Sequence, residues 1–262
     1  MISWLHELPV IVGAALIILF FLVPTIIGVS LLQPIIVRLL RREKDPSLPV
    51  GYLLNAFTLY YAVLLALLSV AVFENYNKAN DAVGREATAI VAFYRDLRGY
   101  PEPARSELIG LLQRYLDEEI GLGWRSQRTG ETAAATTALV NKIDLRITSI
   151  RPEGDTADEA LHFNTLERFD DWVERRRARI QAGRTHIPLI LWYVVLVGAA
   201  LNVIVIWLVD LSRSTHLIVS GVLISFIGLV IYMVAILDRP FLGPAGIGPD
   251  YLVQASQQIR RP

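Results

Sequence analysis

Four long segments of the chain contain no charged side chain, and they constrain the fold more than any other feature. They cover residues 8–37, 50–73, 187–209 and 217–237, and each is at least 21 residues long. An apolar helix of about 20 residues spans the roughly 30 Å hydrocarbon core of a bilayer. We therefore expect an all-α membrane protein with four transmembrane helices.

The composition agrees with a chain of which one part lies in the bilayer and another part lies in water. The 262 residues carry 25 basic and 25 acidic side chains, yet the mean hydropathy is +0.45, which is unusual for a soluble globular domain. The absence of cysteine excludes disulfides, thiolate metal sites and cysteine nucleophiles. No Lys or Arg precedes the first apolar segment, so we expect this segment to be retained rather than cleaved as a signal peptide.

The polar part of the chain is concentrated in residues 74–185, with 17 basic and 19 acidic side chains. Apolar residues recur there every three or four positions, which predicts helices throughout. The same spacing predicts that the second transmembrane helix continues out of the membrane as far as Gly99. The expected organisation is transmembrane helices 1 and 2 in residues 1–73, a helical extramembrane domain in 74–185, transmembrane helices 3 and 4 in 186–237, and a C-terminal tail in 238–262.

Three of the crossings have further constraints. A straight helix of 30 residues would reach about 45 Å, so the first segment must tilt or break, and we expect a kink at Pro24 and an interfacial helix from about Pro34. Only residues 210–216 separate the third and fourth apolar segments. These two helices should therefore form a tight antiparallel pair.

The basic residues near the membrane ends favour different topologies, depending on which residues are counted. Placing residues 74–185 in the cytoplasm puts eleven basic residues inside and leaves five outside, whereas the short loops alone favour the opposite orientation. We favour the first arrangement, with both termini inside. The expected location is the bacterial inner (plasma) membrane, as a multi-pass protein.

Catalytic and metal-binding patterns are absent from the sequence. There is no HExxH, GxxxxGK[ST], GxSxG or Rossmann glycine pattern, and the four histidines are far apart. The adjacent acids Glu118 and Glu119 fall on a helix outside the membrane, where we assign them to a solvated polar face. We therefore expect no enzyme activity, no metal, no cofactor and no nucleic-acid partner.

Polar residues within the apolar segments are more informative, because an unsatisfied polar group in hydrocarbon costs several kcal/mol. The second segment has a stripe of residues that advance by three or four positions. One interpretation is a pore lining with polar ends and an apolar constriction. The other is a seam between helices that uses small and hydroxyl residues. The candidate pore-lining residues are Asn55, Thr58, Ala62, Leu65 and Ser69.

Small residues in the third and fourth segments favour close helix packing over pore lining. Arginines at the end of the extramembrane domain, between Arg175 and Arg179, have two interpretations. They could bind anionic lipid headgroups, or they could belong to a solvated face interleaved with acids. The candidate packing residues are Gly198, Asn202, Gly221, Ser225 and Gly228.

The second segment and the residues after it resemble a known family. The runs Tyr61 to Ala66, Phe73 to Tyr76, Tyr94 to Leu97, Pro101 to Pro103 and Leu237 to Phe241 are similar in order and spacing to the bacterial bestrophin-like domain family. The chain departs from the family at Gly123, where an acidic residue usually precedes the tryptophan. The matching positions are Asn55, Tyr61, Glu74, Tyr76, Arg95, Asp238, Arg239, Pro240 and Phe241.

The resemblance implies a four-helix membrane unit with a helical cytoplasmic part, similar to bestrophins, which are pentameric ion channels whose second helices line the pore. It implies the lipid bilayer, other copies of the chain and small inorganic ions as partners. In such an oligomer Glu74 would form an acidic ring, or it could instead pair with Arg239. Asp238 and Arg239 are expected to end the fourth helix before Pro240. The alternative function is a non-conducting scaffold or sensor whose helical domain docks a cytoplasmic partner.

Overall fold

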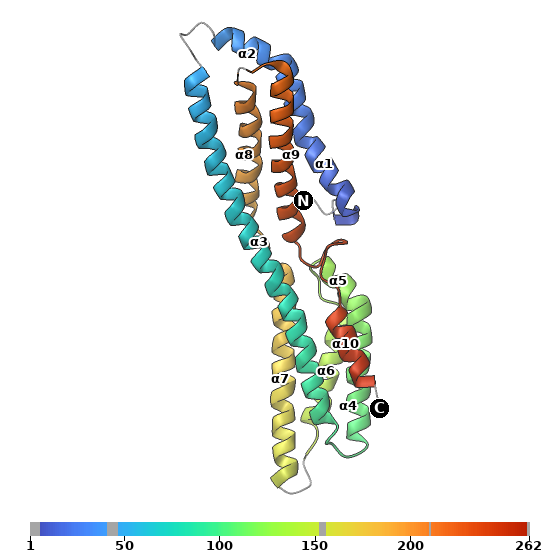
Figure 1. Ribbon diagram of the computed structural model, residues 1–262. Coiled ribbons are helices and arrows are strands. Elements are labelled where there is room, and N and C mark those ends of the chain that lie inside the picture. The colour runs from blue at the N-terminus through green and yellow to red at the C-terminus, as the bar shows by residue number, and fades with distance from the viewer. Residues whose placement is uncertain (1–5, 41–46, 152–155, 210, 261–262) are drawn as a thin grey trace. The chain divides into compact units, whose positions relative to one another are not determined.

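The computed structural model describes residues 6–40, 47–151, 156–209 and 211–260, and within these ranges it contains helices and no strand (Figure 1). The chain forms two compact units. We call the first the transmembrane unit; it comprises Met1–Glu74, His186–Arg239 and Gly243–Ala245. We call the second the helical unit; it comprises Asn75–Thr185, Pro240–Leu242 and Gly246–Pro262.

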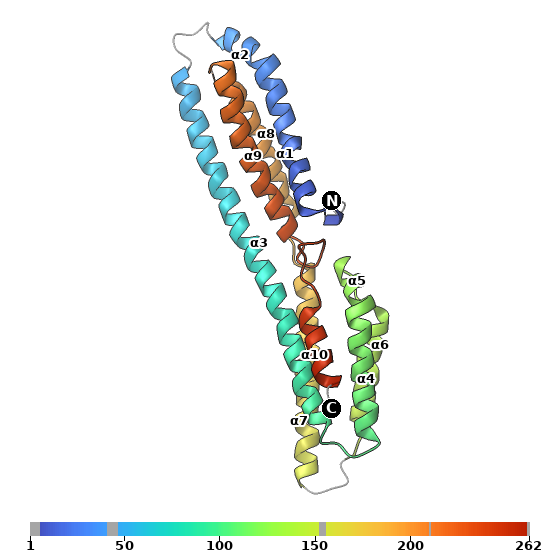
Figure 2. The ribbon, with the colours of Figure 1, turned by 45° about the vertical axis from the view of Figure 1, so that its right-hand side comes forward.

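The transmembrane unit contains the apolar segments. Among the described residues, four helices are long and apolar enough to cross a membrane, as the sequence predicts. Figures 1 and 2 both show α8 and α9 side by side and antiparallel, with α1 beside α9. The elements are α1 (Val10–Ile27), the π-helical turn η2 (Gly28–Leu32), α2 (Gln33–Leu40), the first part of α3 (Ser47–Leu97), α8 (Leu189–Trp207) and α9 (Arg213–Leu237).

The first apolar segment changes direction later than expected. Pro24 lies inside α1, and the departure from regular α-helix occurs at the π-helical turn Gly28–Leu32. Pro34 is the second residue of α2 and directly follows this turn. Both views show α2 running at an angle to α1, so the segment breaks, but by a widened turn rather than at the proline.

Helix α3 is continuous over 51 residues, or about 77 Å. The prediction that the second transmembrane helix continues far beyond its apolar part is confirmed. It ends at Leu97, followed by a turn at Gly99 that precedes Pro101.

The helical unit is built around the second part of α3. Its core includes an aromatic cluster in which Trp172 contacts Phe93, Tyr115 and Phe169, with ring centroids 4.9 to 5.6 Å apart. The remaining elements are α4 (Ala104–Glu118), the π-helical turn η3 (Glu119–Gly123), α5 (Trp124–Arg128), α6 (Ala134–Thr148), α7 (Thr156–Arg184) and α10 (Asp250–Arg260).

Helix α10 has no counterpart among the predicted elements. It buries Leu252, Ala255 and Ile259, and Arg260 forms an ion pair with Asp117 of α4. The spacing of three and four residues between these apolar side chains is helical, but it repeats too few times to stand out within a short tail. The C-terminal tail therefore contributes to the core of the helical unit.

Candidate functional sites

One face of α3 packs inside the transmembrane unit. Tyr61, Leu65, Leu68 and Val72 are buried there, at the helical spacing of three and four residues. The Tyr61 hydroxyl donates a hydrogen bond to the carbonyl oxygen of Val195 in α8, at 3.0 Å. This face is therefore committed to contacts within the same subunit.

The predicted stripe on α3 is divided between this packed face and the exposed surface. Leu65 is only 5% exposed, and the Thr58 hydroxyl donates to the Asn202 side-chain oxygen at 3.5 Å. Asn55 and Ala62 are exposed. Ser69 is half-buried at the border, and its hydroxyl donates to the carbonyl oxygen of Leu65 at 2.7 Å.

A second set of residues follows the surface of α3 along the apolar part of the helix, and all of them are exposed except the half-buried Ser69. We call this set the exposed stripe: Asn55, Leu59, Ala62, Ala66, Ser69 and Phe73. Leu59 and Phe73 are 63% and 55% exposed, although both are large and apolar. The members alternate steps of four and three residues, which is the spacing of helices that pack around a common axis. Glu74, also exposed, directly follows the stripe.

Small residues of α8 and α9 lie at close helix contacts. A Cβ atom added to Gly198 would lie 2.6 Å from the Tyr61 ring, and one added to Gly228 would lie 3.2 Å from the Ile18 Cα atom. Gly221 has more space, since the nearest atom to an added Cβ would be 3.9 Å away. The Asn202 side-chain amide donates to the Gly198 carbonyl oxygen at 3.0 Å. Ser225 is half-buried.

Asp238 joins the end of α9 to the beginning of α8. Its carboxylate accepts hydrogen bonds from the Ile187 backbone N–H at 2.7 Å and from the Trp192 indole at 3.3 Å. The Asp238 carbonyl oxygen lies 3.0 Å from the His186 ring. This arrangement has the geometry of a structural clamp and engages Asp238 within the transmembrane unit.

The remaining family positions are divided between the two units, with Arg239 in the transmembrane unit and the others in the helical unit. Arg239 is half-buried, whereas Pro240 and Phe241 are buried, and the Phe241 ring contacts Trp124 edge to face in the helical unit. Tyr76 packs at the margin of the helical unit's core, and Arg95 is exposed on α3.

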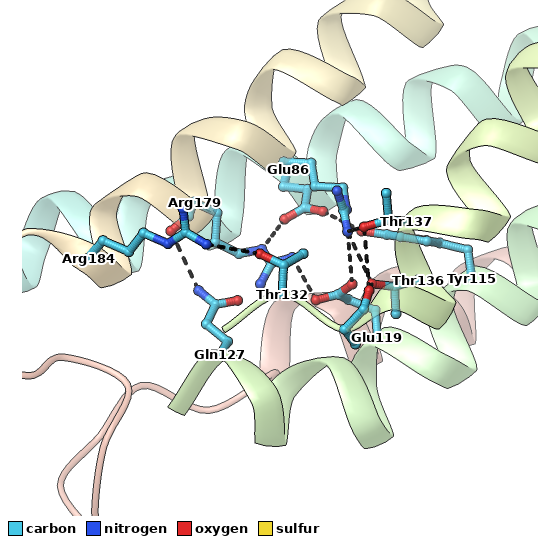
Figure 3. A network of polar contacts seen from close by, with 11 residues as sticks. Glu86, Tyr115, Glu119, Gln127, Thr132, Thr136, Thr137, Arg179 and Arg184 are labelled. Carbon is cyan, nitrogen blue, oxygen red and sulfur yellow. Dashed lines mark hydrogen bonds and ion pairs between the residues drawn. The ribbon is translucent and has the colours of Figure 1, made fainter. Parts of the chain in front are cut away.

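The helical unit also contains a buried network of charges (Figure 3). The Arg179 side chain of α7 is fully buried between two carboxylates. Its Nε donates a short hydrogen bond to Glu86 of α3, and a terminal nitrogen donates to Glu119 of η3 at 2.7 Å. One buried guanidinium thus joins three elements that are far apart in the sequence.

Two further side chains complete this network. The Tyr115 hydroxyl donates to the second oxygen of Glu86 at 2.7 Å. The Arg176 guanidinium lies 3.9 Å from Glu119 and donates to the Thr136 hydroxyl at 3.1 Å. Two arginines therefore face two buried carboxylates, and the four formal charges sum to zero.

The surroundings shift the pKa values of the network. Burial alone lowers the pKa of the Arg179 guanidinium, but the negative charges of Glu86 and Glu119 outweigh this effect and leave it above the ordinary value. Burial, reinforced by Glu86, raises the pKa of the Tyr115 hydroxyl well above 10.0. Arg179 therefore remains charged and Tyr115 neutral at physiological pH.

This network corrects the expected solvated faces. Glu119 is buried rather than on a solvated polar face, and Arg176 and Arg179 are buried inside the helical unit rather than exposed to solvent or to lipid headgroups. Helical register contains a hint of this arrangement. Glu86 follows the buried Val83 by three residues, and Arg179 follows the buried Trp172 by seven, so both charges lie on apolar faces.

These features define a class of protein: an all-α membrane protein with four membrane-spanning helices and a helical extramembrane unit. Within the described part of the chain, no group of three His, Cys, Asp or Glu side chains could hold a metal ion. The family model of the Bestrophin-like domain matches residues 19–252. The chain belongs to the bestrophin-like family.

Solved structures support the same fold. Two crystal structures of a bacterial bestrophin homologue from Klebsiella pneumoniae, each of a point mutant, superpose with TM-scores of 0.71 and 0.69 at 14% sequence identity. The first comparison covers 95% of this chain and 99% of the other, and the second covers 92% and 95%. A structure of a membrane protein gives a TM-score of 0.66 at 14% identity, covering 94% of this chain and 97% of the other. No curated protein matches the chain.

Proposed function

We propose that the chain assembles into a homo-oligomeric, pentameric ion channel in which α3 lines the pore. The observation that carries this proposal is the bestrophin-like family match, together with a fold shared with a bacterial bestrophin homologue over almost the entire chain. Bestrophins are pentameric ion channels whose second transmembrane helices surround the pore. The helical unit would then lie in the cytoplasm and form a vestibule, and the complex would lie in the bacterial inner membrane.

The packing of α3 selects which of its residues can face a pore. A side chain that is already buried in the core of the transmembrane unit, such as Leu65, has no surface left for water or for a neighbouring subunit. We therefore assign the pore surface to the exposed stripe, which retains Asn55, Ala62 and Ser69 from the predicted set and adds Leu59, Ala66 and Phe73. Thr58 and Leu65 then lie on the packed face of α3, within the same subunit.

The polar ends of this surface suit conduction. Asn55 offers an amide at one end of the stripe, and Ser69 offers a hydroxyl toward the other. In a symmetric oligomer, Glu74 would form a ring of carboxylates just beyond the apolar part of α3. Such a ring concentrates cations at the entrance of a pore.

The proposal is tested first by the mass of the detergent-solubilised complex. A pentamer of the 29.3 kDa chain has a protein mass of about 147 kDa, which native mass spectrometry resolves from every other small oligomer. A monomeric, well-folded protein would contradict it, because a single α3 has nothing to enclose.

Conduction is tested in liposomes with a matched pair of variants. Ala62→Trp places a bulky side chain on the exposed stripe and should abolish ion flux. Val222→Trp makes a comparable change at an exposed position of α9 and should leave the flux unchanged. Absence of flux from wild-type pentamers would refute the channel and favour the non-conducting scaffold or sensor.

A further inference from the structure

A groove runs along the surface of α3 in the helical unit, and we call it the α3 groove. Two adjoining cavities of about 690 Å³ and 330 Å³ form it, and they share Gly84, Thr88, Ala92 and Tyr251. The three shared residues of α3 are small and lie about one helical turn apart, so a partner can approach the helix closely along this line. Residues of α7 form one wall of the groove, and residues of α10 form the other.

The charged side chains of the α3 groove are only partly paired with each other. Arg175 pairs with Asp171 at 2.9 Å, and Arg168 lies 3.9 Å from Asp96. The other charged residues of the lining are Asp81, Arg85 and Arg95. These three are exposed, and none of them forms an ion pair with another residue that the structure describes. Along α3 the unpaired charges are therefore one negative charge followed by two positive charges.

The surface of α7 that points away from the core carries the opposite pattern, and we call it the outer face of α7. Its exposed charged members share one side of the helix: Glu159, Glu167, Asp170, Glu174 and Arg177. Within the described part of the chain, none of these five forms an ion pair. Phe163 lies among them and is 69% exposed, and aromatic residues are enriched where proteins associate. From its C-terminal end backwards, this face presents one positive charge and then four negative charges.

The two patterns also match in position along the helices. Figures 1 and 2 show α3 and α7 side by side and antiparallel in the helical unit. Arg85 lines the same cavities as Arg175, the neighbour of Glu174, and Asp96 pairs with Arg168 near the other end of the groove. Rotation about an axis parallel to these helices keeps every residue at its own height. Residues of opposite charge at matching heights are Asp81 with Arg177, Arg85 with Glu174, and Arg95 with Glu167.

We propose that the outer face of α7 docks into the α3 groove of a neighbouring copy of the chain. This inference rests on the proposed oligomer and assigns a subunit interface to it. The two surfaces are different, so the contact is heterologous, and its repetition about an axis closes a ring. The opposite charges at matching heights set the register of the contact and disfavour other registers.

Cross-linking of single cysteines tests the contact in the full-length protein, since the chain has no cysteine of its own. Chains with Thr88→Cys are co-expressed with Asp170→Cys chains that carry a tag of different mass, and the purified complex is treated with a short bifunctional thiol reagent. A cross-linked product of mixed mass is expected. The matched control replaces Asp170→Cys by Leu145→Cys, an exposed position of α6 outside both surfaces, and should give no mixed product.

Native mass spectrometry of the same samples separates this proposal from the proposed oligomer. Pentamers that give no mixed product with Thr88→Cys and Asp170→Cys would overturn the interface and leave the oligomer in place. A monomeric wild type would overturn both.

Charge reversal tests the register of the contact. Arg85→Glu with Arg95→Glu places like charges opposite each other and should lower the yield of the mixed product at least about fivefold. Adding Glu167→Arg and Glu174→Arg restores opposite charges and should recover most of the yield. The control pair Glu131→Arg with Asp144→Arg reverses two exposed charges outside both surfaces and should change the yield less than about twofold. A fourfold variant that recovers no yield, or an equal loss in the control pair, would overturn the proposal.

Discussion

Replacing Arg179 by methionine should destabilise the helical unit strongly. The substitution keeps a flexible side chain of similar length but removes the guanidinium that lies between Glu86 and Glu119. Both carboxylates are almost completely buried, so they would face each other without their principal counter-ion. Removing one partner of a buried ion pair costs about 3–5 kcal/mol, and here one residue serves two carboxylates, so we expect the upper part of this range.

The assay is thermal unfolding of the full-length protein in detergent, followed by tryptophan fluorescence. Trp172 lies in the core beside the network and the Trp124 ring lies 5.3 Å from the Arg179 guanidinium, so both report on the helical unit. At about 2–4 °C per kcal/mol, the apparent melting temperature of Arg179→Met should fall by about 10 °C or more. Arg177→Met, an exposed change on the same helix, should shift it by less than about 2 °C.

A compensating variant separates loss of charge balance from loss of packing. Glu86→Gln and Glu119→Gln, added to Arg179→Met, remove the unpaired charges and should recover at least half of the lost stability. A melting temperature of Arg179→Met within about 2 °C of the wild type, or a triple variant less stable than the single one, would refute a stabilising role for the buried charge pairing.

Three further predictions concern other contacts. Gly198→Ala should reduce the free energy of unfolding by about 1–3 kcal/mol, because the added methyl group overpacks against the Tyr61 ring, and the melting temperature should fall accordingly. Gly221→Ala, where an added Cβ has space, should be neutral or slightly stabilising. Asp238→Ala should cost about 1–3 kcal/mol because it removes the acceptor of the Ile187 N–H, and a melting temperature equal to that of the wild type would exclude the clamp. Because the pKa of Tyr115 is raised in the folded state, its contribution to stability is complete below its ordinary pKa of 10.0 and is lost as pH rises above it; a melting series from about pH 9 to 11 should fall less steeply for Tyr115→Phe than for the wild type.

Much of the fold can be predicted from patterns within single segments. Charge-free runs longer than a bilayer is thick identify the four spans, and unbroken helical spacing extends α3 to Leu97. The deviations arise where neighbouring elements decide the outcome. The first apolar segment departs from regular α-helix at the π-helical turn Gly28–Leu32. Helix α10 is stabilised because its apolar face is buried in the helical unit.

The candidate sites were harder to predict because they depend on pairing between elements. Arg179 and Glu86 are 93 positions apart, and their charges look like ordinary surface charges until α3 and α7 are placed together. On α3, polar and small residues mark a stripe, but a single helix does not say which flank packs against α8. The contact between Tyr61 and Gly198 fixes this rotation and turns Leu65 inward while Ala62 remains exposed.

The most direct test of the central proposal is the water accessibility of single cysteines on α3, which the cysteine-free sequence makes straightforward. Each variant, Ala62→Cys, Leu65→Cys or Val222→Cys, would be reconstituted in liposomes and exposed to a charged, membrane-impermeant thiol reagent while ion flux is recorded. We expect only Ala62→Cys to be modified, and we expect the modification to block its ion flux. Modification of Leu65→Cys with Ala62→Cys unreactive would contradict the proposed pore surface.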